Sequence, residues 1–452
     1  MSEVKKLQKA GDVVVDSILM KGLSNTILNI TPQLVAFEIN ENIFEHYITG
    51  LVTINDSEDL TNFFPIIGME TMEIEFHTPS LGDKDNRFRY KKSFFVYKCS
   101  DRVKVNDRAS VYQLSIISID ALMDKMQRIS KVYRGEGLEI LQKIFKEDLG
   151  SEAEVVGEKT QNQLVFISNY WHPSKCIDYI CNNSVSEESN SSSYLFFEDR
   201  NGYIFTTLNH IFAMPQSQEF NMNNYSVQPG SGSENSTAIK DINADYQSIL
   251  QLDINSEFNY FDRVKNGYYG GEIISYDLNT QQYIHKRDGF NFEWQNHLNI
   301  GKPIPDNFPV SSNSFMMYRP YVTQPFTVNE VQQVSGLDDT NIKYKVARQQ
   351  HIAQLGTTKL TIRVHGRADY TVGQVVLVTI EKDQQTLKQD DVKFDVLTSG
   401  RYIVAGLKHV VNHNEHICYL NLMKDSYIAD MSKSVYDKNP ASGLPASKPV
   451  QS

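Results

Sequence analysis

The sequence contains little cysteine, and its few cysteines show no motif spacing. The 452 residues include four, Cys99, Cys176, Cys181 and Cys418, and no two of them form a CxxC pair. This scarcity argues against a zinc ribbon and against a framework of disulfides. We therefore expect four free thiols and a chain that is made in a reducing compartment.

Long hydrophobic runs and an excess of basic charge are also missing. No apolar run approaches the roughly 20 residues that cross a bilayer, and the N-terminal MSEVKKLQKAGDVVVDS has no hydrophobic region of a signal peptide. The 44 basic and 55 acidic side chains give a net charge of −11, which disfavours a protein that coats nucleic acid. The sequence predicts a soluble protein made in the cytoplasm.

Strand-like alternation is clearest toward the C-terminal end of the chain. Apolar and polar residues alternate from Leu360 to Val364 and from Val376 to Ile380, and again on both sides of a polar tip at Asn412 to Glu415. This is the period of a strand with one wet face. We predict four short antiparallel strands over 358–423, arranged as two hairpins. Their open edges require closure into a barrel or pairing with a second sheet.

A helix is predicted directly before these strands, over 342–356. Apolar residues recur there at helical spacing, and a glycine follows as a C-cap. These residues are Tyr344, Ala347, His351, Leu355 and Gly356. The predicted unit is a small barrel with a helix laid against it.

A first set of strands is predicted near the N-terminal end. Six strand-like segments follow one another closely over 25–122, and we predict that they form a first antiparallel barrel. Residues 1–24 are predicted to be an arm, with a weak helical pattern from Val13 to Met20.

A bend within the first set of strands offers a candidate contact site. Pro65 and Gly68 bend the chain between two apolar stretches. The neighbouring Phe63 and Phe64 form either a simple barrel corner or an exposed lip that packs on another subunit.

After Asp120 the hydrophobic period changes from two to 3.6, which indicates helices. Pro173 is placed to begin one helix and Gly150 to end another, and Asn201-Gly202 is a strong hairpin signal. We predict a compact α+β domain over 123–225.

The predicted fold is mostly β, with two antiparallel barrels and the α+β domain inserted between them. The composition of the rest of the chain predicts its remaining segments. They are a linker or loop at 226–239, a second barrel at 240–431 that also uses strands at 249–261 and 268–286, an ordered insertion loop at 289–335, and a flexible tail at 432–452.

Four stretches, in this order, resemble a known family. They are PIIGMETMEIEFHTP at 65–79, YQLSIISIDALMDKMQRISKVYRGEGLEILQKIF at 112–145, YLFFEDRNGYIFTTL at 194–208, and the helix with its strands at 344–423. The chain resembles baseplate hub proteins of contractile phage tails, which are related to the N-terminal hub part of type VI secretion spike proteins. The resemblance covers most of the chain.

This resemblance implies a structural protein of the virion tail, made in the host cytoplasm. It implies two tail-tube-like barrels per chain and a homotrimer, which adapts the six-fold tail tube to the three-fold central spike. The implied partners are the tail tube protein or a tube initiator, the central spike protein and neighbouring baseplate wedge proteins. Genome DNA would pass through the ring without specific binding.

Candidate catalytic and metal-binding residues form weak patterns. His409, His413 and His416 on the second hairpin could share a metal, but solvated histidines at a polar tip are the commoner case. Asp338-Asp339 and Asp390-Asp391 are typical of solvated turns. The GEG at 135–137 lacks the other residues of a phosphate loop, and neither GxSxG nor HExxH occurs. We predict no catalytic, cofactor-binding or metal-binding residues, and no enzyme activity.

Two other functions stay open at this point. A tail-associated cell-wall hydrolase would need an acid/base pair that the sequence does not display. A receptor- or carbohydrate-binding module is suggested by 24 tyrosines and two tryptophans, although most of these fall within strand periods and so favour core positions.

A channel through which DNA passes would also restrict the number of basic residues on its inner surface. Each Lys or Arg that neutralises a phosphate adds affinity and would slow the transit of a polyanion. We therefore expect few basic residues on inward-facing strands. The basic residues Arg87, Arg89, Lys91 and Lys92 are expected at subunit contacts or in outer solvent.

Overall fold

The structure is a computed structural model. It describes residues 9–222 except 24, 59, 61–63, 65, 80, 82–84 and 107–108, and then residues 242–256, 261, 265–266, 270–277, 283–289, 314–319, 339–381, 395 and 397–427. The predicted linker at 226–239, the tail at 432–452 and most of the loop at 289–335 lie outside the described residues.

The N-terminal part of the chain forms antiparallel strands in the hydrogen-bonded order β3-β4-β7-β6-β5-β1-β2. The elements are β1 (Val14–Lys21), β2 (Ile27–Asn29), η1 (Thr31–Gln33), β3 (Leu34–Asn42), β4 (Thr49–Asp56), β5 (Thr71–His77), η2 (Asn86–Phe88), β6 (Arg89–Asn106) and β7 (Ala109–Ser118). The six strands predicted over 25–122 are confirmed.

The N-terminal arm differs from its prediction. Val14–Lys21 is strand β1, which pairs with β5, so the helical pattern predicted from Val13 to Met20 was wrong. Ile18 and Met20 are buried while the residues between and beside them are more exposed, which is the period of two of a strand. Pairing with a neighbouring strand decides the conformation where the local helical signal is weak.

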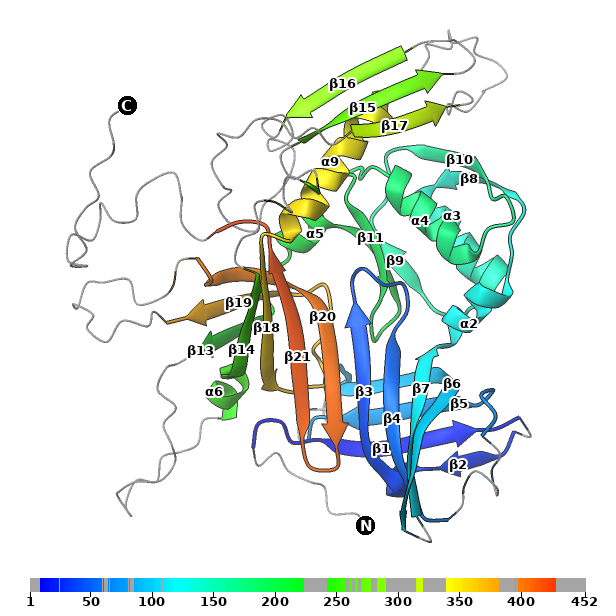
Figure 1. Ribbon diagram of the computed structural model, residues 1–452, viewed down its shortest axis with the longest axis vertical. Helices are drawn as coiled ribbons and strands as arrows, with labels where there is room; N and C mark the ends of the chain where they lie inside the picture. The colour runs from blue at the N-terminus through cyan, green and yellow to red at the C-terminus, as the bar shows by residue number, and fades with distance from the viewer. Residues whose placement is uncertain are drawn as a thin grey trace, which may run out of the picture.

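The second set of strands lies in the C-terminal part of the chain. Its elements are β13 (Gln218–Met222), α6 (Ile242–Gln247), β14 (Ile249–Ser256), α9 (Asp339–Leu355), β18 (Thr358–His365), β19 (Val375–Ile380), β20 (Gly400–Asn412) and β21 (His416–Lys424). The predicted helix and the four predicted strands are confirmed (Figure 1).

The pairing within this second set is more complex than two hairpins. Strands β20 and β21 form the predicted second hairpin. The first predicted pair does not form, because β18 lies between β14 and β21 whereas β19 pairs with β20 and with β13. Alternation of apolar residues identifies a strand but not its neighbours.

A separate three-stranded sheet lies beside α9. It consists of β15 (Gly270–Asp277), β16 (Tyr283–Gly289) and β17 (Ser314–Arg319), with β15 in the middle. The prediction that 268–286 supplies strands of the second barrel was therefore wrong. Strand β17 lies in the segment that was predicted to be an insertion loop. Figure 1 shows this sheet at the end of the molecule reached by α9.

The two sets of strands are joined edge to edge. Strand β20 pairs antiparallel with β3 over seven residue pairs, from Gly406 opposite Asn42 to Asn412 opposite Ala36. The result is one 13-stranded sheet. The mostly β, antiparallel class is confirmed. Hydrogen bonds between the described strands run from one set into the other and do not close either set into a separate barrel.

The α+β unit is inserted between the two sets of strands. Its elements are α2 (Ile119–Met126), β8 (Val132–Glu136), α3 (Gly137–Lys143), the π-helix η3 (Ile144–Leu149), β9 (Val155–Gly157), β10 (Gln163–Ile167), α4 (Pro173–Asn183), β11 (Tyr194–Glu198), β12 (Tyr203–Thr207) and α5 (Leu208–Ala213). Pro173 begins α4, Gly150 ends η3 with φ at 64°, and Asn201-Gly202 turns the β11–β12 hairpin, all as predicted.

Three hydrophobic cores lie mainly in the two sets of strands and the α+β unit, although the C-terminal core also includes β11 and α5 residues of the α+β unit such as Phe197 and Phe212. The N-terminal core also contains Ala368 and Val411 from the C-terminal strand set. At its centre the Phe76 ring lies 5.3 Å from the Phe37 ring and stacks on the Tyr90 ring at 5.0 Å. The Phe76 ring also lies 6.1 Å from the ring of His409 on β20, so it packs against residues on both sides of the β3–β20 joint.

Replacement of Phe76 by alanine tests this packing. We expect Phe76→Ala to lower the free energy of unfolding by about 3–5 kcal/mol, because a fully buried ring is lost and the surrounding core cannot fill the cavity. Tyr97→Ala on β6, where the side chain is 51% exposed, is the matched control and should change it by less than about 0.5 kcal/mol. Urea denaturation followed by circular dichroism measures both; equal midpoint shifts would refute the central role of Phe76.

Candidate functional site

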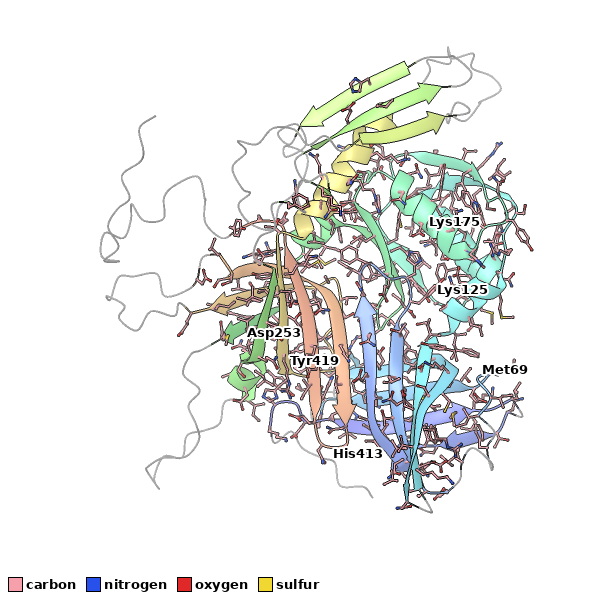
Figure 2. All side chains as sticks on the ribbon, viewed as in Figure 1. Met69, Lys125, Lys175, Asp253, His413 and Tyr419 are labelled. Atoms are coloured by element: carbon pink, nitrogen blue, oxygen red, sulfur yellow. The ribbon has the colours of Figure 1, made fainter. Side chains whose placement is uncertain are left out.

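The three units meet at one buried polar cluster, which we call the three-unit junction. It consists of Glu41 on β3, Lys92 on β6, Glu198 and Arg200 at the β11–β12 hairpin, and the loop 366–374 between β18 and β19. The four segments that supply these residues are distant from one another in the sequence. Figure 2 shows the described side chains of the three units on the ribbon.

A buried ion pair holds the α+β unit against the N-terminal strands. Lys92 Nζ lies 2.8 Å from Glu198 Oε1, and the two side chains are 13% and 4% exposed. Lys92 Nζ also donates to the Asp199 carbonyl at 2.6 Å. The other oxygen of Glu198 accepts hydrogen bonds from the Ile48 amide at 2.8 Å and from the Ser118 hydroxyl.

This placement corrects the prediction for Lys92, which does not lie at the outer surface. Lys92 shares a face of β6 with the buried Tyr90, two residues before it, so its side chain is directed inward. The other basic residues of the run are placed differently. Arg87 is exposed beside Asp85, Arg89 pairs with Asp16 and Glu75, and Lys91 pairs with Glu73 and Glu75.

Arg200 links the hairpin to both sets of strands. Its Nη1 donates to the Arg87 carbonyl at 2.5 Å and to the Ala368 carbonyl at 2.5 Å. The hairpin turn itself is fixed by Asp199, whose Oδ1 accepts from the Asn201 amide at 2.7 Å and the Gly202 amide at 2.9 Å. One guanidinium thus contacts both strand sets from the α+β unit.

Glu41 is a buried carboxyl group of the junction. It is 2% exposed, and its Oε2 accepts from the Thr371 hydroxyl at 2.9 Å and the Val372 amide at 3.4 Å. Burial raises the pKa of Glu41 to about 7, with Lys92 lowering it and Asp199 raising it further. The sequence did carry a signal, since Glu41 continues the inward series Phe37, Ile39 of β3.

The sequence predicted that the histidines of the β20–β21 hairpin are solvated, and this was wrong for two of the three. His413 is at the hairpin tip (Figure 2), where its Nε2 lies 2.7 Å from the Leu34 carbonyl oxygen. His409 and His416 are fully buried and lie against Cys418. Burial, with a contribution from Arg200, lowers the pKa of His409 to about 3, and burial also lowers the pKa of His416.

The predicted lip at the Pro65 bend is only partly described. Phe64 is 6% exposed and packs in the N-terminal core, with its ring against Gly22. This leaves little of the Phe64 side chain for a contact with another subunit. Phe63 lies outside the described residues, and the subunit contact stays a prediction.

Other candidate residues are structural where the structure describes them. Gly137 of the GEG sequence begins α3, and Asp339 begins α9. Asp338, Asp390 and Asp391 lie outside the described residues. All four cysteines are free thiols, as predicted; Cys176, Cys181 and Cys418 are buried and Cys99 is exposed.

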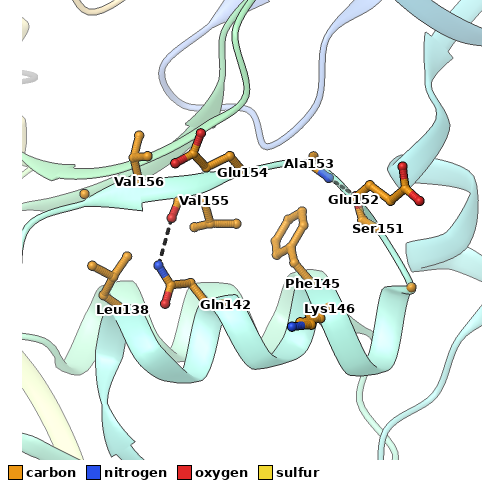
Figure 3. A pocket seen from close by; sticks show the side chains of 12 residues that line it. Leu138, Gln142, Phe145, Lys146, Ser151, Glu152, Ala153, Glu154, Val155 and Val156 are labelled. Atoms are coloured by element: carbon orange, nitrogen blue, oxygen red, sulfur yellow. Dashed lines mark hydrogen bonds between the residues drawn. The ribbon is translucent and has the colours of Figure 1, made fainter.

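A groove of 780 Å³ lies between the α3–η3 helix and the segment that leads into β9 (Figure 3). Gln142 crosses it and donates to the Val155 carbonyl at 3.0 Å. Its charged side chains, Lys146, Glu152 and Glu154, point in different directions. Such divergence does not assemble the acid/base pair that hydrolysis requires.

The fold and the junction define a scaffold in which three units are locked together by buried polar contacts. No family model matches the chain. The chain is 22% identical over 451 residues to a probable baseplate hub protein, gp334, of the Vibrio phage KVP40, covering 95% of this chain and 98% of that one.

Two solved structures share the fold over nearly the whole chain. A tail protein from Neisseria meningitidis MC58 has a TM-score of 0.53 at 11% identity and covers 90% of this chain and 96% of its own. The 43 kDa tail protein of prophage MuSo2 from Shewanella oneidensis has a TM-score of 0.50 at 9% identity, covering 91% and 98%.

These findings confirm the resemblance to baseplate hub proteins that the sequence predicted. They support a structural role in the tail of a phage virion. Within the described part of the chain, no helix is both long and apolar enough to span a membrane.

Removal of the Lys92 ammonium tests the buried ion pair. We expect Lys92→Met to lower the free energy of unfolding by about 3–5 kcal/mol, because the Glu198 carboxylate then stays buried without its counter-charge. Lys92→Met combined with Glu198→Gln should cost less than the sum of the single changes. The control is Lys91→Met, whose surface pairs contribute less than about 1 kcal/mol. Urea titrations decide, and equal costs for the two lysines would contradict the assignment.

Glu41 predicts a specific pH dependence of stability. Its folded pKa of about 7 lies above the ordinary value of 4.5, so the stability it contributes is fully present below about pH 4.5 and is lost as the pH rises through about 7. The loss is about 3 kcal/mol.

Glu41→Gln should abolish this loss and raise the free energy of unfolding at pH 8 relative to the wild type. Glu38→Gln serves as the control, because Glu38 lies on the same strand but pairs with Lys408 at a half-exposed site. Urea denaturation from pH 4.5 to 8 measures the three proteins. Parallel stability profiles for wild type and Glu41→Gln would show that Glu41 is charged throughout.

Proposed function

We propose that the protein is the structural hub of a phage baseplate and that it acts as a homotrimeric adaptor. The observation that carries the proposal is the match to a probable baseplate hub protein along almost the whole of both chains. The tail-protein fold supports it. In this role the hub joins the six-fold tail tube to the three-fold central spike.

The arrangement of strands suits this task. Each chain carries two sets of antiparallel strands that are fused through β3 and β20, so three chains supply six strand sets around one axis. The described sheet ends at β14 on one side and at β2 on the other. Such edges would be used up by pairing between subunits in a closed ring.

The same ring would form part of the DNA channel. Several basic residues of the described strands are already paired with acids of the same chain, namely Arg89 with Glu75, Lys91 with Glu73 and Lys408 with Glu38. Such pairing leaves less positive charge for phosphates and supports transit without specific binding. The proposed partners are the tail tube protein or a tube initiator, the central spike protein and baseplate wedge proteins.

We further propose that the protein is not an enzyme and that it consists of three units near the predicted ranges 25–122, 123–225 and 240–431, with β1 added to the first unit and β13 to the third. Three separate hydrophobic cores support the division into units. The divergent charged side chains of the groove beside α3 do not favour a cell-wall hydrolase. Five tyrosines, Tyr90, Tyr112, Tyr194, Tyr203 and Tyr402, are fully buried, which does not favour a carbohydrate-binding surface.

The state of assembly tests the proposal. Mass photometry of the 51.7-kDa chain, alone and mixed with its tube-side and spike-side neighbours, should show a species of about 155 kDa or a complex that contains three copies. Ile27→Asp places a charge at an exposed position of the edge strand β2 and should abolish the trimer while the monomer stays folded.

Val132→Asp is the control, because Val132 is similarly exposed but lies on β8 of the α+β unit, outside the large sheet. It should leave assembly unchanged. A stable monomer under every condition, with both neighbours present, would refute the trimeric adaptor.

A further inference from the structure

Three potential metal ligands meet inside the core of the large sheet. The register of the β20–β21 hairpin places His409 directly opposite Cys418 and Val411 opposite His416. His416 and Cys418 are two residues apart on β21 and so share a face. All three side chains, His409, His416 and Cys418, are fully buried.

The ligand atoms of these residues form a compact triangle. His409 Nδ1 lies 2.9 Å from His416 Nε2, and Cys418 Sγ lies 3.2 Å from the first nitrogen and 3.4 Å from the second. A tetrahedral zinc site with ordinary Zn–N and Zn–S bonds has edges of about 3.4 to 3.6 Å. Each edge of the triangle would have to open by only about half an ångström or less.

We propose that His409, His416 and Cys418 bind a structural transition-metal ion of the Zn²⁺ class. Two imidazoles and one thiolate are ligands that this borderline-soft ion prefers. Binding replaces the thiol proton of Cys418 by an S–Zn bond and releases that proton to solvent. These side chains supply three of the four ligands of a tetrahedral site.

The backbone at Gly366 supports this assignment. Gly366 packs so closely on the His416 ring that an added Cβ would lie 2.3 Å from a ring carbon, which fixes the ring toward the other two ligands.

The surroundings make a structural role more suitable than a catalytic one. The Phe76 ring lies 5.5 Å from the His416 ring and 6.1 Å from the His409 ring, and the Tyr90 ring lies 6.0 Å from the His409 ring. These rings separate the triangle from bulk solvent. The ion would lock the β20–β21 hairpin, whose β20 edge pairs with β3, and it would enter as the chain folds.

Metal content tests the proposal on the full-length chain. Protein made in zinc-supplemented cells and gel-filtered in chelator should retain about one zinc per chain by mass spectrometry of the elements. Cys418→Ser and His409→Gln should retain less than a tenth of that amount. The controls His413→Gln, on the same hairpin, and Cys181→Ser, at another buried cysteine, should retain the wild-type amount.

A second measurement covers the case in which the ligand variants do not fold. Wild-type protein refolded with Co²⁺ should show a thiolate-to-cobalt absorption band and a raised Tm, and both should be unchanged in Cys181→Ser. Wild-type protein that contains no more zinc than Cys418→Ser would overturn the proposal. Refolding with Co²⁺ that gives neither the band nor a shift in Tm would also overturn it and would assign the triangle to a metal-free hydrogen-bonded cluster.

Discussion

The pairing of β3 with β20 is the interaction on which the rest of the structure depends. It joins two sets of strands that would otherwise each present an open edge, and open edges invite association with other chains. The two strands are separated by more than half of the sequence, so the pairing closes a very long loop. The large apolar cores on both sides of the joint offset that cost, and Val411 of β20 itself packs in the N-terminal core.

Polar contacts at the three-unit junction fix the orientation of the α+β unit relative to the two joined sets of strands. Apolar surfaces tolerate sliding, whereas the Lys92–Glu198 pair and the two hydrogen bonds of Arg200 are satisfied in one arrangement only. Buried charges contribute little net stability. We infer that they serve instead to hold the α+β unit at a fixed position on the sheet.

The sequence predicted where strands and helices lie better than it predicted which strands pair with one another. Alternation revealed β18 to β21 and helical spacing revealed α9, because these signals are local. The pairing of β20 with β3, the separate sheet of β15 and β16, and the inward placement of Lys92 depend on contacts between distant segments. Glu41 could have been singled out as a charged residue in an inward series. His409 and His416 were misjudged because their burial depends on packing against a distant segment, the one that carries Phe76.

The central claim is that the three units form one cooperative body. Hydrogen exchange at increasing denaturant, read by mass spectrometry of peptides from β3, β20 and the β11–β12 hairpin, tests it most directly. The account predicts that all three peptides lose protection together, in one transition. Loss of protection in the β11–β12 hairpin at clearly lower denaturant than in β3 and β20 would contradict it, because the α+β unit would then open independently of the sheet.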